Sequence, residues 1–141
     1  MFPCALFPRA AKHVFVSAPN PVFALQELVD RFRDVPGVEG GVVARRDGLV
    51  IAHNLPGGAD AKRVAAMAAV IVNASLSAVN ELERGGYQLT IVQSSLGRVV
   101  CANAGMEAIF AAVLSHEANL GLVLLRLEGV ARQVEEVLEY L

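Results

Sequence analysis

The chain has 141 residues, close to the usual size of one domain, and no break in composition divides it. Twelve basic and fourteen acidic side chains leave a formal charge of −2 without the basic stripe that phosphate binding needs, so we expect no nucleic-acid partner. Hydrophobic residues make up 55% of the chain and charged residues only 18%, a surplus that favours a surface buried between protein chains.

Residues 1–20 form a proline-rich segment that we predict to be a loosely ordered N-terminal extension. It does not have the pattern of a targeting segment, because Pro3 and Pro8 interrupt the apolar stretch and the basic residues Arg9 and Lys12 follow it. No run in the chain approaches the roughly 18–20 uninterrupted apolar residues of a bilayer-spanning helix, so we expect no membrane insertion.

A first helix is predicted to begin at Asn20-Pro21, an N-cap side chain followed by a ring whose fixed φ suits the first turn. Apolar residues then recur at helical spacing until Pro36-Gly37 ends the run. These residues are Phe23, Leu25, Leu28, Val29 and Phe32.

Two short β-like runs follow, Val38–Arg45 and Leu49–Asn54. Asp47 and Gly48 between them predict a hairpin turn and have a structural role, because glycine accepts the positive φ of a tight turn. The pair Gly40-Gly41 inside the first run indicates a bulge or a close approach of another backbone.

The longest helix is predicted over about Ala59–Arg84, with Asp60 favourably placed in its first turn. One stripe suffices to cover a sheet: Val64, Met67, Ile71, Ala74 and Ala78. Small or apolar residues also fill most of the remaining circumference, where a surface helix would carry lysine and glutamate: Ala65, Ala66, Ala69, Val70, Val72, Asn73 and Ser77. We predict a protein interface there, formed by Ala65, Ala66, Ala69, Val70, Asn73 and Ser77. Alanine serving only as a good helix former is the alternative. We expect Ala69→Arg to abolish a contact without unfolding the chain.

Three further strands are predicted over Tyr87–Gln93, Arg98–Ala102 and Glu107–Leu114, joined by short turns. Asn119 can then cap a last helix that reaches Leu141. Short hairpin connections require antiparallel neighbours, so the sequence predicts an α+β layer fold with a five-stranded, mostly antiparallel sheet in the order α-β-β-α-β-β-β-α. The helices cover the apolar faces of that sheet.

Residue types that carry catalysis are present but scattered. Three histidines lack HxxxH or HExxH spacing and are not expected to bind metal: His13, His53 and His116. Ser94-Ser95 lacks the GxSxG frame of a nucleophile, and no glycine pattern forms a phosphate cradle, so we expect neither catalytic residues nor a cofactor. The two cysteines, Cys4 and Cys101, lie far apart and lack CxxC spacing, which favours a reducing, cytoplasmic setting. Cys101 lies in the middle of a predicted strand, between Val100 and Ala102, so we expect a buried, unreactive thiol there.

Several segments, in this order and spacing, resemble the Roadblock (dynein light chain) family, in particular its bacterial and archaeal members of the gliding-motility MglB type. The segments are Val35-Pro36-Gly37-Val38, Gly41-Val42-Val43-Ala44, Asp47-Gly48-Leu49-Val50-Ile51-Ala52, Ala65–Ala69 and Asn119-Leu120-Gly121-Leu122-Val123. The resemblance covers about Leu25–Leu138 and implies that residues 21–141 form one Roadblock-like domain.

The resemblance implies a homodimer, joined through two sheets or two long helices, that serves as a platform for a small Ras-like GTPase. Members of the MglB type activate GTP hydrolysis without lending a catalytic side chain. In this chain Ala65, Ala66, Ala69, Val70 and Asn73 match the part of the long helix used for pairing and for the GTPase. Asn119 and Gly121 match the start of the last helix, which they are expected to cap and to hold close to the sheet.

The sequence thus favours a non-catalytic, homodimeric regulator of a small Ras-like GTPase. Two alternatives remain: a passive dimeric scaffold subunit of a larger signalling or motor-like complex, and a small-molecule sensor with a pocket beneath the sheet.

Overall fold

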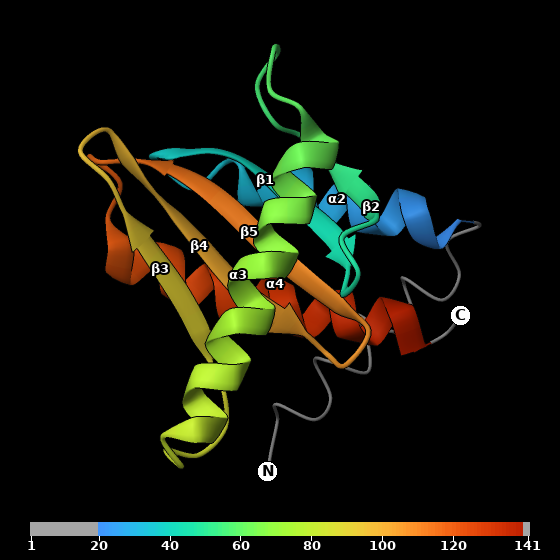
Figure 1. The fold of residues 1–141 in the computed structure, drawn as a ribbon. Coiled ribbons are helices and arrows are strands. Elements are labelled where there is room, and N and C mark those ends of the chain that lie inside the picture. Colours follow the sequence, from blue (N-terminus) through green and yellow to red (C-terminus); the bar gives the residue numbers. More distant parts are fainter. Residues whose placement is uncertain (1–19, 140–141) are drawn as a thin grey trace, which may run out of the picture.

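The computed structural model describes residues 20–139, which fold in the predicted order of helices and strands (Figure 1). The elements are α2 (Pro21–Phe32), β1 (Val38–Arg45), β2 (Val50–His53), α3 (Ala61–Glu81), β3 (Leu89–Gln93), β4 (Gly97–Ala104), β5 (Ala108–Ser115) and α4 (Leu120–Glu139). Residues 1–19 of the predicted N-terminal extension, with Cys4 and His13, and the last two residues of the expected final helix lie outside the described residues.

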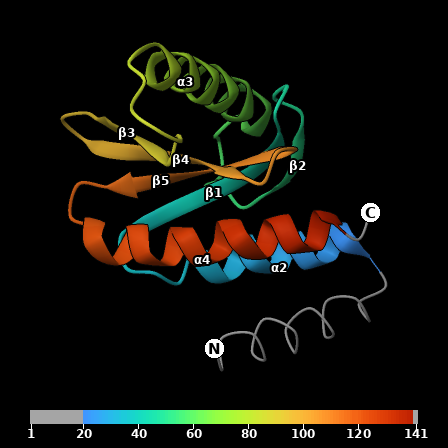
Figure 2. The same cartoon turned by 90° about the horizontal axis from the view of Figure 1, so that it is seen from below.

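The five strands form one sheet in the order β2-β1-β5-β4-β3, and every neighbouring pair is antiparallel. Figure 2 shows α3 on one face of this sheet and α2 and α4 side by side on the other. The α+β layer fold predicted from the sequence is therefore confirmed. β2 and β3 are the two edges of the sheet, and β1, β4 and β5 lie between them.

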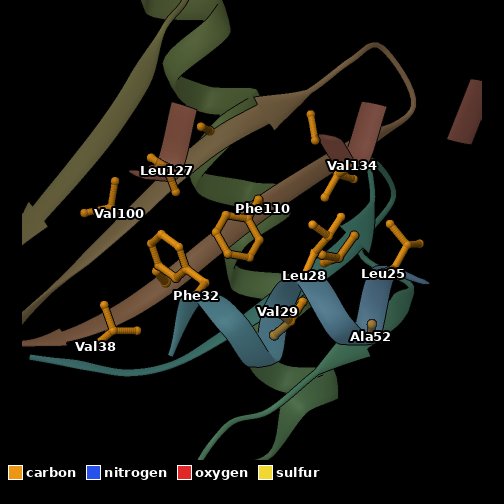
Figure 3. Packing of buried hydrophobic residues seen from close by; sticks show 14 of the residues in the cluster. Leu25, Leu28, Val29, Phe32, Val38, Ala52, Val100, Phe110, Leu127 and Val134 are labelled. Atoms are coloured by element: carbon orange, nitrogen blue, oxygen red, sulfur yellow. The ribbon is translucent and has the colours of Figure 1, made fainter. Parts of the chain in front are cut away.

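The larger core lies between the sheet and the α2/α4 layer. Asn20 caps α2, since its side chain accepts a hydrogen bond from the backbone N–H of Val22 at 2.9 Å. The apolar face of α2 then packs on the sheet, where the rings of Phe32 and Phe110 meet edge to face with centroids 5.1 Å apart (Figure 3). This layer holds the larger of the two clusters of buried residues and both of the phenylalanines that are buried in the described part of the chain, Phe32 and Phe110.

The β1–β2 hairpin has the geometry that its sequence predicts. Gly48 has φ +97°, and the Asp47 carboxylate accepts a hydrogen bond from the Leu49 N–H at 3.2 Å. The pairing register of β1 shifts between Val38 and Gly40, and a Cβ built on Gly40 would lie 2.9 Å from the Cα of Leu55. Both the bulge and the close backbone approach expected at Gly40-Gly41 are present.

The second core, between the sheet and α3, is built from small residues and corrects the expected orientation of this helix. The residues that α3 buries are Ala65, Ala68, Ala69 and Val72. Of the stripe expected to cover the sheet, Val64 and Ile71 do pack against this core, but Met67 is 53% exposed, and Ala74 and Ala78 are also exposed. Alanine faces the sheet because its small side chain lets the helix approach the strands closely. Hydrophobic periodicity could not identify this buried side, because apolar residues occur all round the helix.

Candidate interaction surface

The outer face of α3 carries no charged side chain between Arg63 and Glu81. Its exposed residues in that stretch are Ala66, Met67, Val70, Asn73, Ala74, Ser77, Ala78 and Asn80, and we call them the α3 outer face. Met67 and Val70 are 53% and 60% exposed, respectively. A solvent-facing helix normally carries lysine and glutamate here, so this surface has the composition of a protein contact.

The six residues predicted for the interface do not all lie on the same side of α3. Ala66, Val70, Asn73 and Ser77 belong to the α3 outer face, where a partner could reach them. Ala65 and Ala69 are 0% and 6% exposed and pack against the chain's own sheet. The expectation that Ala69→Arg leaves the fold intact is therefore wrong, because that side chain would enter the core.

The β1–β2 turn adjoins this surface. A Cβ built on Gly48 would lie 3.3 Å from the Cα of Ala66 and 3.6 Å from the Cβ of Ala69. Leu49, the next residue in the turn, is 60% exposed. The turn and the α3 outer face therefore lie next to each other, and a partner on the helix would also meet the turn.

Edge strand β3 is open to pairing with another strand. It contains neither a charged residue nor a proline, and Ile91 and Val92 are 38% and 41% exposed. Proteins usually protect an edge with lysine, proline, a bulge or a very short strand. The opposite edge, β2, has such protection, since it is four residues long and its register with β1 shifts next to Ala44.

A line of hydroxyl groups fixes β3 to α3. Thr90 donates a hydrogen bond to the hydroxyl of Ser75 at 2.7 Å, and Ser75 in turn donates to the carbonyl of Ile71 at 2.7 Å. The Tyr87 hydroxyl lies 2.6 Å from Thr90 Oγ1 and donates to the Cys101 carbonyl at 3.2 Å. Burial raises the pKa of Tyr87, partly offset by its hydrogen bond to Thr90. These hydrogen bonds thus connect α3 directly to the open edge strand.

The four residues with predicted structural roles lie away from the α3 outer face or at its margin. Asp47 and Gly48 form the hairpin turn described above. Asn119 Oδ1 accepts a hydrogen bond from the N–H of Leu122 at 3.1 Å, at the start of α4. Gly121 does not hold α4 close to the sheet, because the only atom within 4 Å of a Cβ built there is Asn119 Oδ1.

The residue types associated with catalysis do not assemble in the described part of the chain. Residues 20–139 contain no group of three histidine, cysteine, aspartate or glutamate side chains placed to hold a metal ion. His53 and His116 are exposed, far apart in sequence. Cys101 is fully buried, and burial raises the pKa of its thiol to about 11, so it is a poor nucleophile at neutral pH.

By length and composition alone, α3 could also cross a membrane. The sequence did not indicate such a helix, because the apolar residues of α3 do not form one uninterrupted run. Its inner side, however, packs against β1, β4 and β5 through Ala65, Ala69 and Val72. The apolar composition of α3 therefore includes one side that packs on the chain's own sheet and one side that is exposed.

Comparison with known proteins identifies relatives that match most of the chain. Residues 24–115 match the family model described as Roadblock/LC7 domain. Uncharacterized protein MJ0714 of Methanocaldococcus jannaschii is 30% identical over 115 residues, which cover 79% of this chain and 97% of that protein.

Two solved structures share the fold. One is described as MglB with tetrameric arrangement, with a TM-score of 0.80 and 20% identity over 87% of this chain and 93% of that one. The other is the gliding protein MglB from Thermus thermophilus, with a TM-score of 0.78 and 20% identity over 88% and 95% of the two chains.

Proposed function

Because this chain belongs to the Roadblock/LC7 domain family, we propose that it is a non-catalytic, homodimeric regulator of a small Ras-like GTPase. The observation that carries the proposal is the uncharged α3 outer face, next to an unprotected edge strand. The shared fold with MglB supports the same function, since the MglB type is the one that the sequence resembles.

The homodimer forms through β3 and α3 together. Two β3 strands pair in an antiparallel manner across a twofold axis, which satisfies the backbone groups that each edge leaves free. Because the Ser75–Thr90 hydrogen bond fixes α3 beside β3, the same axis brings the two α3 helices near each other. The part of the α3 outer face that the second copy leaves free, including Val70, then receives the GTPase.

The dimer acts on the GTPase by holding its switch regions in position and supplies no catalytic side chain. Phosphoryl transfer depends on positioning and charge stabilisation more than on covalent help from a protein, so a platform that holds the switch regions can accelerate hydrolysis. A surface of alanine, serine and valine suits that role, because it lets a partner approach closely and loses little side-chain entropy on binding. No cofactor takes part, and we place the protein in the cytoplasm.

GTP hydrolysis by a cognate Ras-like protein, with and without this chain, tests the proposal. We expect saturating dimer to raise the single-turnover rate, and Val70→Arg to remove that effect. An unchanged rate, together with equal binding to the GDP and GTP forms, would contradict the regulator and favour the passive scaffold. The control is Arg84→Ala, at an exposed position beyond the end of α3.

A further inference from the structure

A groove with a volume of about 560 Å³ lies between α2 and α4. These two helices cover the face of the sheet opposite α3 (Figure 2). The floor of the groove is apolar, formed by the buried side chains of Leu28, Phe32 and Val35 with the partly buried Val130. Leu125 at its margin is 70% exposed, and a Cβ built on Gly129 would meet no atom within 4 Å. The groove can therefore admit a bulky apolar side chain from outside.

The charge of this groove is opposite in sign to that of the whole chain. Three arginines line it, Arg31 from α2 and Arg126 and Arg132 from α4, against the single carboxylate of Glu136. The formal charge of the chain is −2. Within residues 20–139, the side chains of Arg31 and Arg126 form no ion pair and donate no hydrogen bond, while Arg132 has an exposed pair with Glu128 at 3.4 Å. Two guanidinium groups thus remain available on opposite walls.

We propose that this groove binds an acidic amphipathic segment of another protein. A leucine or aromatic side chain of the segment lies on the floor over Phe32, and flanking carboxylates pair with Arg31 and Arg126. Guanidinium groups suit this recognition, because they bind carboxylates in a bidentate manner and stay charged. The mode is that of an amphipathic helix in an apolar groove, which requires apolar anchors at helical spacing.

Other occupants have the wrong charge. Residues 1–19 of this chain are apolar but carry Arg9 and Lys12 and no acidic residue, so the groove arginines would repel them. An anionic membrane would meet the acidic residues exposed on or just beyond the same two helices before it reached the groove. These residues are Glu27, Asp30, Asp34, Glu128, Glu135 and Glu139. The same residues would repel a segment that is acidic along its whole length, so the carboxylates of the bound segment must lie over Arg31 and Arg126 and its other exposed residues must be uncharged.

The test uses the full chain and a short synthetic helical peptide in which glutamates flank leucine and phenylalanine. The control peptide has the same sequence with lysine in place of every glutamate. The protein variants are Arg31→Glu/Arg126→Glu and, as a control with the same change in net charge, Lys62→Glu/Arg84→Glu. Amide chemical shifts map the site, titration gives the dissociation constant, and circular dichroism checks that each variant is folded.

We expect saturable binding of the glutamate peptide with shifts confined to α2 and α4. The groove variant should weaken binding about tenfold or more, while the control variant should not. Equal binding of the two peptides, shifts located on α3, or an unaffected groove variant would overturn the proposal. Tighter peptide binding after removal of residues 2–19 would also overturn it, because the chain's own segment would then be the occupant. None of these readouts depends on GTP hydrolysis.

Discussion

The hydroxyl oxygens of Ser75 on α3 and Thr90 on β3 lie 2.7 Å apart and join the long helix to the edge strand. Tyr87 and the Ile71 carbonyl extend this contact on either side, so each hydroxyl has a partner. The two surfaces proposed for self-association are therefore held in a fixed relation. Loss of this contact should affect both the fold and the dimer.

Thr90→Val keeps the shape of the side chain but removes its hydroxyl. We expect the free energy of unfolding to fall by about 1–2 kcal/mol, because Ser75 and Tyr87 each lose a partner at a partly buried position. Urea denaturation measures this change, and Thr90→Ser, which keeps a hydroxyl, is the control. Equal stability of the valine and serine variants would show that the hydroxyl line does not hold β3 in place.

Ala69 and Val70 are neighbours in α3, but only Ala69 is buried against the sheet, so the two should respond differently to the same substitution. Ala69→Arg should destabilise the fold by at least about 3 kcal/mol, because it places a large charge in the sheet-facing core. Val70→Arg should leave the monomer folded with a change of no more than about 0.5 kcal/mol, because this side chain points outward. Thermal unfolding followed by circular dichroism compares them, and similar losses in both variants would refute the assignment of the two sides.

A charge in the open edge should prevent self-association. Thr90 contacts α3, so Ile91 next to it points to the other face of the sheet and remains 38% exposed at the edge. Ile91→Lys should shift the protein from dimer to monomer, because like charges would meet where two β3 strands pair. The control Leu96→Lys adds the same charge at a hairpin residue that is 84% exposed, outside β3. Sedimentation velocity of both variants provides the measurement; a dimeric Ile91→Lys would argue against pairing through β3.

Cys101 should make stability depend on pH in the alkaline range. Burial raises the pKa of its thiol from 9.0 to about 11, so the folded state holds this proton more tightly than the unfolded state. The stabilisation is complete below pH 9 and is lost as the pH rises towards 11. Tyr87, whose pKa is also raised by burial, acts in the same direction. Urea denaturation from about pH 8 to about pH 11 should show a shallower decline for Cys101→Ala, and an identical slope would contradict this assignment.

Strand boundaries were predictable where turn residues frame a strand. Pro36-Gly37 and Asp47-Gly48 enclose β1, which begins and ends at the predicted residues. The start of β3 was harder to predict. Tyr87 continues the alternating pattern of the strand, yet it lies before β3, and its hydroxyl contacts Thr90. Contacts of this kind depend on how whole elements pack together, and no local pattern encodes them.

The sheet-facing side of α3 was predicted only in part, since Val64 and Ile71 pack on the sheet but the other three residues of the predicted stripe are exposed. Periodicity identifies a buried side only when the other side is polar, and alanine or valine occurs all round this helix. The sheet selects the side that permits the closest approach, so Ala65 and Ala69 face inward while Met67 faces outward. The open edge at β3 could have been noticed from its lack of charge and proline, once its position at the end of the sheet was known.

The molecular mass in solution tests most directly the central claim that protein covers the α3 outer face and the β3 edge. Sedimentation equilibrium over a wide concentration range should give twice the 14.9 kDa of one chain, and hydrogen exchange should be slow in the amides of β3 that face outward from the sheet. A mass of 14.9 kDa at every concentration, with fast exchange along β3, would contradict the account.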